Sequence, residues 1–265
     1  MRPEGFRFSK AMGQNFLVDG TVAERTVRAA GLDGSFGVLE IGPGSGALTS
    51  RLCAAAGRVV AVELDRRLIP LLEQELEGYG NVEVIHGDIL KLDIAEIVSD
   101  RLGGLRRAVC SNLPYNITTP AITALLRSES FELITVMTQR EVAARICAPP
   151  GSSECGAFSI FCQFYADCER LFDVPPGAFF PRPKVYSSVV SMRPLGARAV
   201  AREDEAMFLR VVRASFAQRR KTLLNALHAV FGAQMTKDEL SATLTSLDIT
   251  PSTRGETLGI PAFAS

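Results

Sequence analysis

The segment Ser111–Tyr115 holds the residues with the most specific chemistry in the sequence. The exocyclic amine of a nucleobase is a poor nucleophile, because its lone pair is delocalised into the ring. The amide oxygen of Asn112 and a backbone carbonyl of Leu113 or Pro114 can accept hydrogen bonds from such an amine and hold its nitrogen towards tetrahedral geometry. Proline fixes its own φ, so these acceptors are preset, and Tyr115 can stack on the base. The alternative is an ordinary turn beside a packed tyrosine.

A glycine-rich segment, Glu40–Leu48, stands where an apolar run ends and a helical pattern begins. Glycine lacks a Cβ and lets a ligand approach the backbone N–H groups at a helix N-terminus, so Gly42 and Gly44 are candidate ligand-binding residues. Together with Ala47 they also satisfy the dinucleotide pattern G-x-G-x-x-G/A. A dehydrogenase with a Rossmann fold therefore remains an alternative on this motif alone.

Two acidic residues mark the ends of the next two apolar runs. Glu63 lies 21 residues after Gly42, where a carboxylate can accept hydrogen bonds from both hydroxyls of a ribose. Asp88 follows the third run, where it would reach the adenine end of a nucleoside. An acidic residue after the third run is characteristic of S-adenosylmethionine enzymes and is not required by NAD sites. Helix capping is the alternative role for Asp65 and Asp88, but the order of the acids along the chain favours cofactor binding.

These residues need a sheet to position them. Five short apolar runs alternate with helical patterns such as 48–56 and 68–76, which predicts an α/β fold with a parallel sheet covered on both faces. The five runs are 36–41, 58–64, 81–86, 107–111 and 133–137. Two later β-like runs, 168–174 and 187–193, predict an antiparallel hairpin at a sheet edge. From Glu203 onward the apolar spacing is helical. We therefore predict domains at 1–195 and 196–265.

The cysteines and the composition exclude several other classes. Six cysteines occur without a C-x-x-C pair and with only two histidines, His86 and His228, so neither a disulfide framework nor a metal site is expected. No apolar run reaches the ~18 residues of a membrane-spanning helix, and no secretory signal is evident. We expect a cytoplasmic protein without a membrane partner, and nothing in the sequence requires more than a monomer.

Eight motifs, in their order and spacing, resemble the KsgA-type small-subunit rRNA adenine dimethyltransferases, a family related to the Erm resistance methyltransferases. The resemblance covers almost the whole chain. Its motifs are Gly13–Leu17, Glu40–Gly44, Val62–Glu63, Gly87–Asp88, Asn112–Tyr115, Val174–Phe179, Pro181–Val185 and Gln218–Lys221. The resemblance implies a Rossmann-like, class I S-adenosylmethionine methyltransferase sheet with a small all-helical C-terminal domain. The implied reaction is N6,N6-dimethylation of two adjacent adenosines in the 3′-terminal hairpin of small-subunit (16S) rRNA, within a pre-ribosomal particle during ribosome biogenesis.

The resemblance also assigns roles to single residues. It implies S-adenosyl-L-methionine as the cofactor, contacted by Asn15, Leu17, Gly42, Glu63, Asp88 and Asn112. It implies that the target adenine is flipped out, held by Asn112 and the loop backbone, and stacked on Tyr115 and Phe179. Phe180 could replace Phe179, and core packing is the alternative for both. One departure is Tyr186, which stands where the family often has Asp.

The formal net charge of zero hides a strong asymmetry. Residues 60–100 contain ten acidic and three basic residues, whereas residues 177–221 contain ten basic and three acidic ones. A basic stretch of this kind is typical of a phosphate-binding face. The candidate RNA-binding residues are Lys10, Arg182, Lys184, Arg213, Arg219, Arg220 and Lys221. A solvated helix end is the alternative for residues 219–221, and Arg213 and Arg220 would share a face if one helix ran through both.

Two other functions remain open besides the small-subunit enzyme. An Erm-like methyltransferase of large-subunit (23S) rRNA is the enzymatic alternative, although the loop 179–185 favours the small-subunit family. A ribosome-assembly factor that only binds RNA is the non-enzymatic alternative. The intact Asn112–Tyr115 segment argues against pure binding.

Overall fold

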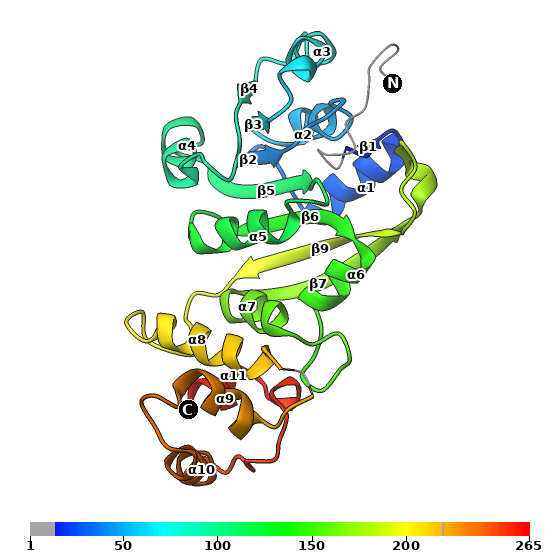
Figure 1. The fold of residues 1–265 in the computed structure, drawn as a ribbon. Helices are drawn as coiled ribbons and strands as arrows, with labels where there is room; N and C mark the ends of the chain where they lie inside the picture. Colours follow the sequence, from blue (N-terminus) through cyan, green and yellow to red (C-terminus); the bar gives the residue numbers. More distant parts are fainter. Residues whose placement is uncertain (1–13, 219) are drawn as a thin grey trace. The chain divides into compact units, whose positions relative to one another are not determined.

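The computed structural model describes residues 14–218 and 220–265 of the chain. Its main sheet has seven strands in the order β4-β3-β2-β5-β6-β9-β7 (Figure 1). The strands are β2 Phe36–Ile41, β3 Arg58–Glu63, β4 Val82–His86, β5 Arg106–Asn112, β6 Leu133–Gln139, β7 Ala166–Val174 and β9 Ser187–Pro194. All five apolar runs predicted from the sequence are strands of this sheet, and they pair in parallel.

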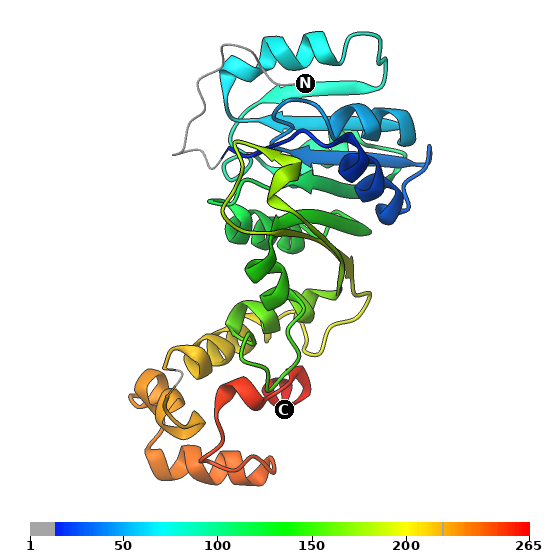
Figure 2. The ribbon, with the colours of Figure 1, turned by 90° about the vertical axis from the view of Figure 1, so that its right-hand side faces the viewer.

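Both faces of the parallel strands are covered by helices (Figures 1 and 2). Neighbouring residues of a strand point to opposite faces, and Val59 and Val60 are both fully buried. Val38 belongs to the core cluster that also contains residues of α1, α2 and α3. On the opposite face, Gly37 lies against Leu102 at the end of α4. The helices are α1 Gly20–Ala30, α2 Thr49–Ala55, α3 Ile69–Glu75, α4 Ile94–Arg101, α5 Thr118–Arg127 and α6 Arg140–Ile146.

The two late β-like runs lie together at one edge of the sheet, as the sequence predicts. β9 pairs antiparallel with β6, with Val190 opposite Val136, and β7 is the outermost strand. A second, two-stranded sheet joins β1 (Phe16–Leu17) to β8 (Phe179–Phe180) in antiparallel register. The sequence contains no hint of this pair, because two-residue strands are too short to show a period of two.

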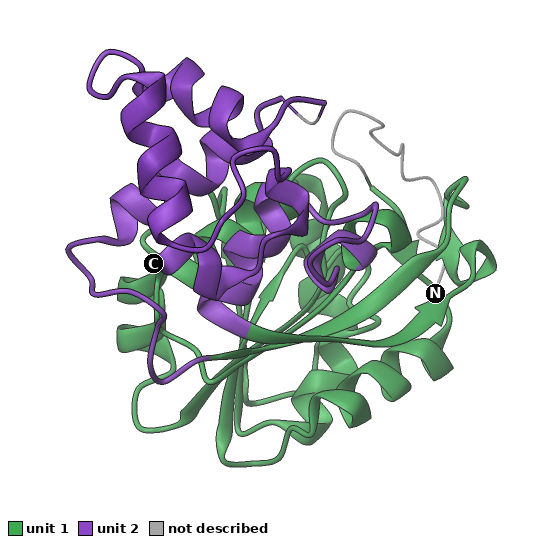
Figure 3. Cartoon of the chain, turned by 90° about the horizontal axis from the view of Figure 1, so that it is seen from below, with its two compact units in different colours: residues 1–143, 167–194 green, residues 144–166, 195–265 purple. Residues whose placement is uncertain are grey.

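The chain divides into two compact units (Figure 3). The first ends at Ala143 and resumes over 167–194, and the second combines 144–166 with 195–265. This division differs from the boundary predicted from sequence in its treatment of 144–166. The physical reason is aromatic packing within the second unit. Phe164, with 1% of its surface exposed, stacks on Phe208 with 4.4 Å between ring centroids.

The second unit is helical in its described part. Its helices are α7 Ala157–Tyr165, α8 Glu205–Phe216, α9 Leu223–Phe231, α10 Lys237–Ser246 and α11 Ile260–Ala264. α8 ends at Phe216 and does not continue to Arg220, so the condition under which Arg213 and Arg220 would share one helical face is not met. Thr222 caps the N-terminus of α9, and Thr236 and Glu239 form a capping box on α10; both caps satisfy backbone N–H groups that a helix leaves free. None of the helices in the described ranges has the length and apolarity to cross a membrane.

Candidate active site

A pocket in the first unit lies where four neighbouring parallel strands end. Gly42 follows β2, Glu63 closes β3, Asp88 follows β4 and Asn112 closes β5, and all four line the pocket. The carboxyl edge of an open parallel sheet is where such folds bind ligands. Every residue predicted from sequence to contact a cofactor is among the lining residues: Asn15, Leu17, Gly42, Gly44, Glu63, Asp88 and Asn112.

The glycine segment approaches the rest of the site so closely that side chains would not fit. Gly42 and Gly44 have φ values of +67° and +59°, a region that glycine adopts at little cost. A Cβ on Gly42 would lie 3.2 Å from Pro114 Cγ, and one on Gly44 would lie 2.7 Å from Phe16 Cδ1. The glycines therefore let β1 and the Asn112–Tyr115 loop close on the same pocket.

The side chain of Asn112 is oriented by a distant part of the chain. Its Nδ2 donates a hydrogen bond to the backbone oxygen of Asn15 at 3.2 Å. Because that oxygen can only accept, the amide nitrogen must face it, and Oδ1 is left pointing elsewhere. Asn112 Oδ1 is buried and makes no hydrogen bond within the described part of the chain. Such an atom is costly unless a ligand donates to it.

The loop that carries Asn112 is fixed by backbone and side-chain hydrogen bonds. The N–H of Leu113 donates to Met137 O of β6 at 3.0 Å. The Pro114 carbonyl accepts from the N–H of Ile117 at 3.1 Å and from Thr118 Oγ1 at 3.2 Å. The acceptor capacity of Pro114 is therefore used within the turn, whereas the sequence left Leu113 and Pro114 as equal candidates for the second acceptor.

Tyr115 is held in place through its hydroxyl. Its Oη and Ser187 Oγ are 2.7 Å apart, which joins the loop to the start of β9. Burial raises the pKa of Tyr115, partly offset by the hydrogen bond to Ser187. The phenol is therefore neutral at ordinary pH, which makes Tyr115 a packing or stacking residue and not a general base.

The pocket is acidic. Its charged lining residues are Glu40, Glu63 and Asp88, and none of the described lining residues is Lys, Arg or His. Glu63 accepts from the N–H groups of Asp65 at 2.8 Å and Gly44 at 3.2 Å, yet burial still raises its pKa. Burial, and secondarily the charge of Glu63, raises the pKa of Glu40 to about 8. Such a pocket is suited to a cation and is unfavourable for the pyrophosphate of a dinucleotide.

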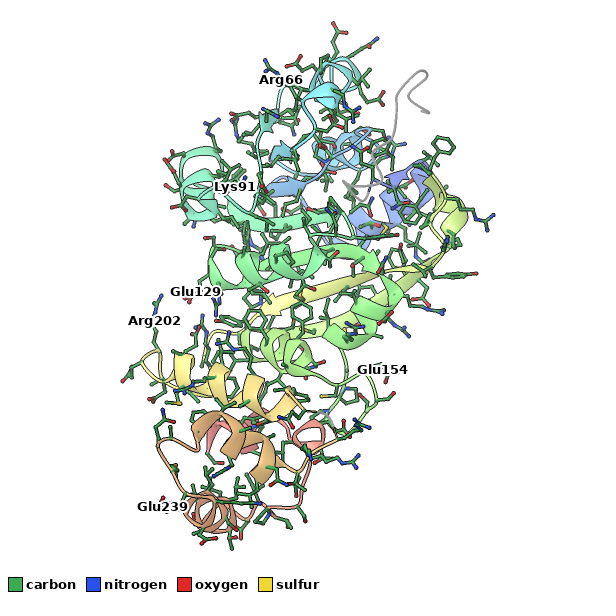
Figure 4. The ribbon with its side chains drawn as sticks, viewed as in Figure 1. Arg66, Lys91, Glu129, Glu154, Arg202 and Glu239 are labelled. Atoms are coloured by element: carbon green, nitrogen blue, oxygen red, sulfur yellow. The ribbon has the colours of Figure 1, made fainter. Side chains whose placement is uncertain are left out.

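The part of the pocket next to β3 and β4 combines the carboxylate of Asp88 with apolar side chains. Asp88 accepts from the N–H of Leu90 at 3.1 Å, and its Oδ2 lies 3.7 Å from Nζ of Lys91, whose exposed side chain is labelled in Figure 4. Leu64 and Leu90 line the pocket although they are 49% and 41% exposed. Exposed leucines that flank the two acids suit the faces of a flat aromatic ligand, and sequence reasoning missed them because a single surface leucine is ordinary.

Glu40 is a second lining residue without a role predicted from the sequence, although it belongs to the Glu40–Gly44 motif. It is 1% exposed, and its Oε2 has no hydrogen-bond partner within the described ranges. A glutamate in the middle of a buried apolar run is the signal that could have singled it out, because unpaired carboxylates are rarely buried.

Several other predicted residues lie away from the pocket. Phe179 pairs with Leu17 in the small sheet, is 3% exposed and belongs to the hydrophobic core, so it is not among the lining residues. Asp65 caps the turn of residues 66–68 and pairs with Arg67 at 2.6 Å, which is the capping role that the sequence left open.

The candidate RNA-binding residues are divided between the two units. Lys10 and Arg219 lie outside the described residues. Arg182 and Lys184 are exposed in the first unit, and Arg213, Arg220 and Lys221 are exposed in the second.

Comparison with known proteins decides what kind of pocket this is. The family model for ribosomal RNA adenine dimethylase matches residues 5–257. The chain belongs to this family. It is 44% identical over 264 residues to "Ribosomal RNA small subunit methyltransferase A" of Geobacillus sp. (strain WCH70), which covers 98% of this chain and 91% of the relative. The protein of the same name from Shouchella clausii (strain KSM-K16) is 44% identical over 266 residues, covering 100% and 90%.

Solved structures agree with this family assignment. A dimethyladenosine transferase from Plasmodium falciparum superposes with a TM-score of 0.80 at 26% identity, covering 94% of each chain. The 23S rRNA methyltransferase ErmE superposes with a TM-score of 0.72 at 23% identity, covering 94% of this chain and 96% of that one, and shows the shared fold. The fold is therefore the predicted α/β class I methyltransferase fold, and the protein is an rRNA methyltransferase.

The residues present fit S-adenosylmethionine, the cofactor of this enzyme class. The cofactor is a cation at its sulfonium and ammonium groups, and the pocket offers Glu40, Glu63 and Asp88 without a basic lining residue. Glycines without Cβ atoms admit it against the backbone, and the buried Glu40 Oε2 is an acceptor without a partner in the described chain. Within residues 14–218 and 220–265, no group of three or more His, Cys, Asp or Glu side chains is placed to hold a metal ion.

Gly44→Ala tests the close contact between the glycine segment and β1. Gly31 is the matched control, because its φ is +62° and a Cβ there would meet nothing within 4 Å. Gly31→Ala should lower the free energy of unfolding by about 1 kcal/mol, and Gly44→Ala should lower it further. Calorimetry should show weaker S-adenosylmethionine binding for Gly44→Ala only. Equal stability losses with unchanged affinity in both variants would contradict the contact.

Glu40→Gln tests the raised pKa of Glu40. Between pH ~4.3, where an unfolded Glu titrates, and the folded value of about 8, the folded protein holds one more proton than the unfolded chain. The free energy of unfolding should therefore fall by roughly 1 kcal/mol per pH unit as the pH rises through this range. Urea unfolding should show a shallower decline for Glu40→Gln than for wild type. The control Glu24→Gln removes a carboxylate that is 59% exposed and should leave the decline unchanged; identical declines in both variants would refute the assignment.

Proposed function

We propose that the protein transfers methyl groups from S-adenosylmethionine to the N6 amines of two adjacent adenosines in the 3′-terminal hairpin of small-subunit rRNA. The observation that carries the proposal is Asn112 Oδ1, a buried acceptor without a partner in the described chain, on a loop that lines an acidic pocket. The names of the relatives at 44% identity support the small-subunit RNA as the substrate. The paired adenosines and the hairpin rest on the motif resemblance.

Two acceptors are needed to activate the N6 amine. Asn112 Oδ1 accepts from one of its hydrogens, with the side chain held by Asn15 O. Leu113 O is the second acceptor that we propose, because Pro114 O is already used by Ile117 and Thr118. In the first transfer, accepting from both hydrogens pulls the nitrogen out of conjugation with the ring and directs its lone pair towards the methyl donor. The monomethylated amine has one hydrogen left, which one of the two acceptors binds in the second transfer.

The remaining pocket residues hold the cofactor and the base. S-adenosylmethionine would supply a methyl group on its sulfonium sulfur, and the neutral thioether would be the leaving group when the amine displaces it in line. Glu63 would accept from the ribose hydroxyls and Asp88 from the adenine amine, between Leu64 and Leu90. Gly42 and Gly44 would admit the methionine part. No general base is required, since the methylated amine is acidic and releases its proton to solvent.

The structure supports Tyr115 more strongly than Phe179 as the aromatic partner of the target base. Tyr115 lines the pocket and its hydroxyl is held by Ser187, so we propose that its ring stacks on the flipped adenine. Phe179 is buried and lies opposite Leu17 in the β1–β8 pair, and its stacking role stays a prediction.

We propose that the RNA is held by basic residues of both units. Arg182 and Lys184 alternate with the prolines of the β8–β9 loop, and Arg220 and Lys221 precede α9; all four are exposed. Two flipped adenines need a surrounding RNA surface to hold their register, which favours a pre-ribosomal particle as substrate. The protein would act there as a cytoplasmic monomer.

Asn112→Ala should strongly reduce methyl transfer while sparing RNA binding. Loss of a preorganised acceptor should lower kcat by about a hundredfold or more, and the dissociation constant for RNA should stay within about twofold. Incorporation of labelled methyl groups and filter binding measure the two quantities. Asn225→Ala, on the exposed surface of α9, should change neither. Retained turnover in Asn112→Ala would refute its proposed role.

Neutralising Arg220 and Lys221 should weaken RNA binding and reduce its salt dependence. For each side chain that neutralises one phosphate, its removal should make the slope of log K against log salt concentration shallower by about 0.7–0.9. Lys91→Gln is the control, because its side chain is 82% exposed beside the acidic Asp88. An unchanged slope in the Arg220→Gln, Lys221→Gln variant would mean that these residues are only solvated.

A further inference from the structure

An exposed aromatic residue lies close to the active site without a role in the proposed chemistry. Tyr186 is 46% exposed and follows Val185, which is 45% exposed, at the end of the β8–β9 loop. Two neighbouring exposed side chains of this size on a loop offer a surface that a partner could cover.

The ring of Tyr186 is held by its surroundings. The guanidinium carbon of Arg140 lies 5.2 Å from the ring centroid, within the range of a cation–π contact. The backbone N–H of Arg140 also donates to Tyr186 O at 2.9 Å. Arg140 thus holds both the backbone and the ring at the first residue of α6, while nearly half of the side chain stays accessible.

The position of Tyr186 relative to the pocket follows from strand register. The next residue, Ser187, lies opposite Gln139 in the β6–β9 ladder and contacts the hydroxyl of Tyr115 at 2.7 Å. Tyr115 lines the pocket. Tyr186 is therefore one residue away from a direct contact with the pocket wall. It lies at the same edge of the sheet as Asn112, which pairs with Met137 in register.

The charges around Tyr186 suit a polyanion. Arg140, Arg182 and Lys184 are all exposed in the same unit, the last two on the same loop as Tyr186. An aromatic ring among cations next to a base-binding pocket is the usual composition of a surface that stacks a nucleobase while its phosphates are neutralised.

We infer that Tyr186, positioned by Arg140, is the stacking platform for the nucleobase next to the target adenosine. The inference rests on the proposed function, because it needs an RNA substrate whose target base is flipped into the pocket. When the target adenine is flipped into the pocket, the adjacent nucleobase loses its stacking partner. The ring of Tyr186, outside the pocket, would take the place of that partner. The residue would thereby set the register in which RNA is presented to Asn112.

Steady-state methylation of immature small ribosomal subunits tests this platform. Tyr186→Ala should raise KM for the RNA substrate at least fivefold with kcat within about twofold of wild type, whereas Tyr186→Phe should behave as wild type because stacking needs the ring and not the hydroxyl. The ratio of KM between Tyr186→Ala and wild type should be the same at about 50 and about 200 mM salt, since stacking is not screened. Tyr79→Ala, which removes a ring that is 36% exposed in the segment before β4, is the control and should leave KM unchanged.

The outcomes separate this inference from the function on which it rests. An unchanged KM for Tyr186→Ala in an active enzyme, or an equal loss in Tyr186→Phe, would overturn the platform and leave the proposed function intact. An effect that disappears at the higher salt concentration would also overturn it, because the residue would then act through charge. Failure of the wild-type enzyme to methylate the particle would overturn both. S-adenosylmethionine affinity, measured by calorimetry, should be equal in all variants, which checks that each one is folded.

Discussion

The hydrogen bond between Asn112 Nδ2 and Asn15 O is the interaction on which the chemistry of this site depends. It joins residues 97 positions apart in the chain and decides which end of the amide faces the pocket. Reversal of the amide would put two N–H donors against the hydrogens of an incoming amine. The β1–β8 pair and the contact of Phe16 with Gly44 hold the Asn15 segment in place, so these small elements serve the orientation of the side chain that we propose activates the amine.

The second constraint is the charge of the pocket. The acidic side chains of Glu63 and Asp88 at strand ends and of Glu40 within β2, with a described lining without basic residues, make the site favourable to a sulfonium cofactor and unfavourable to a dinucleotide. The same glycine spacing would otherwise serve either ligand. Burial raises the pKa values of Glu40 and Glu63, which means that the protein maintains these groups at a cost in stability that a bound cation can offset.

The sequence predicted the sheet and most of the pocket for the same physical reason. Parallel strands are buried on both faces and show as apolar runs, and their carboxyl ends meet at one edge, so Glu63, Asp88 and Asn112 had to converge. It did not predict features that depend on tertiary packing. Phe164 joins residues 144–166 to the helical unit, Phe179 is buried opposite Leu17 in the β1–β8 pair, and Pro114 O accepts hydrogen bonds within its own turn. None of these leaves a periodic or compositional signal.

The most direct test of the central claim is to map methylation in a strain from which the gene is deleted. Two methyl groups on N6 leave the adenine without an amine hydrogen for base pairing, so reverse transcription stops at each modified adenosine. Primer extension should lose its stop at two adjacent adenosines near the 3′ end of small-subunit rRNA, and the wild-type gene should restore it while Asn112→Ala should not. A stop that persists there, or one that is lost only from the large-subunit RNA, would contradict the account.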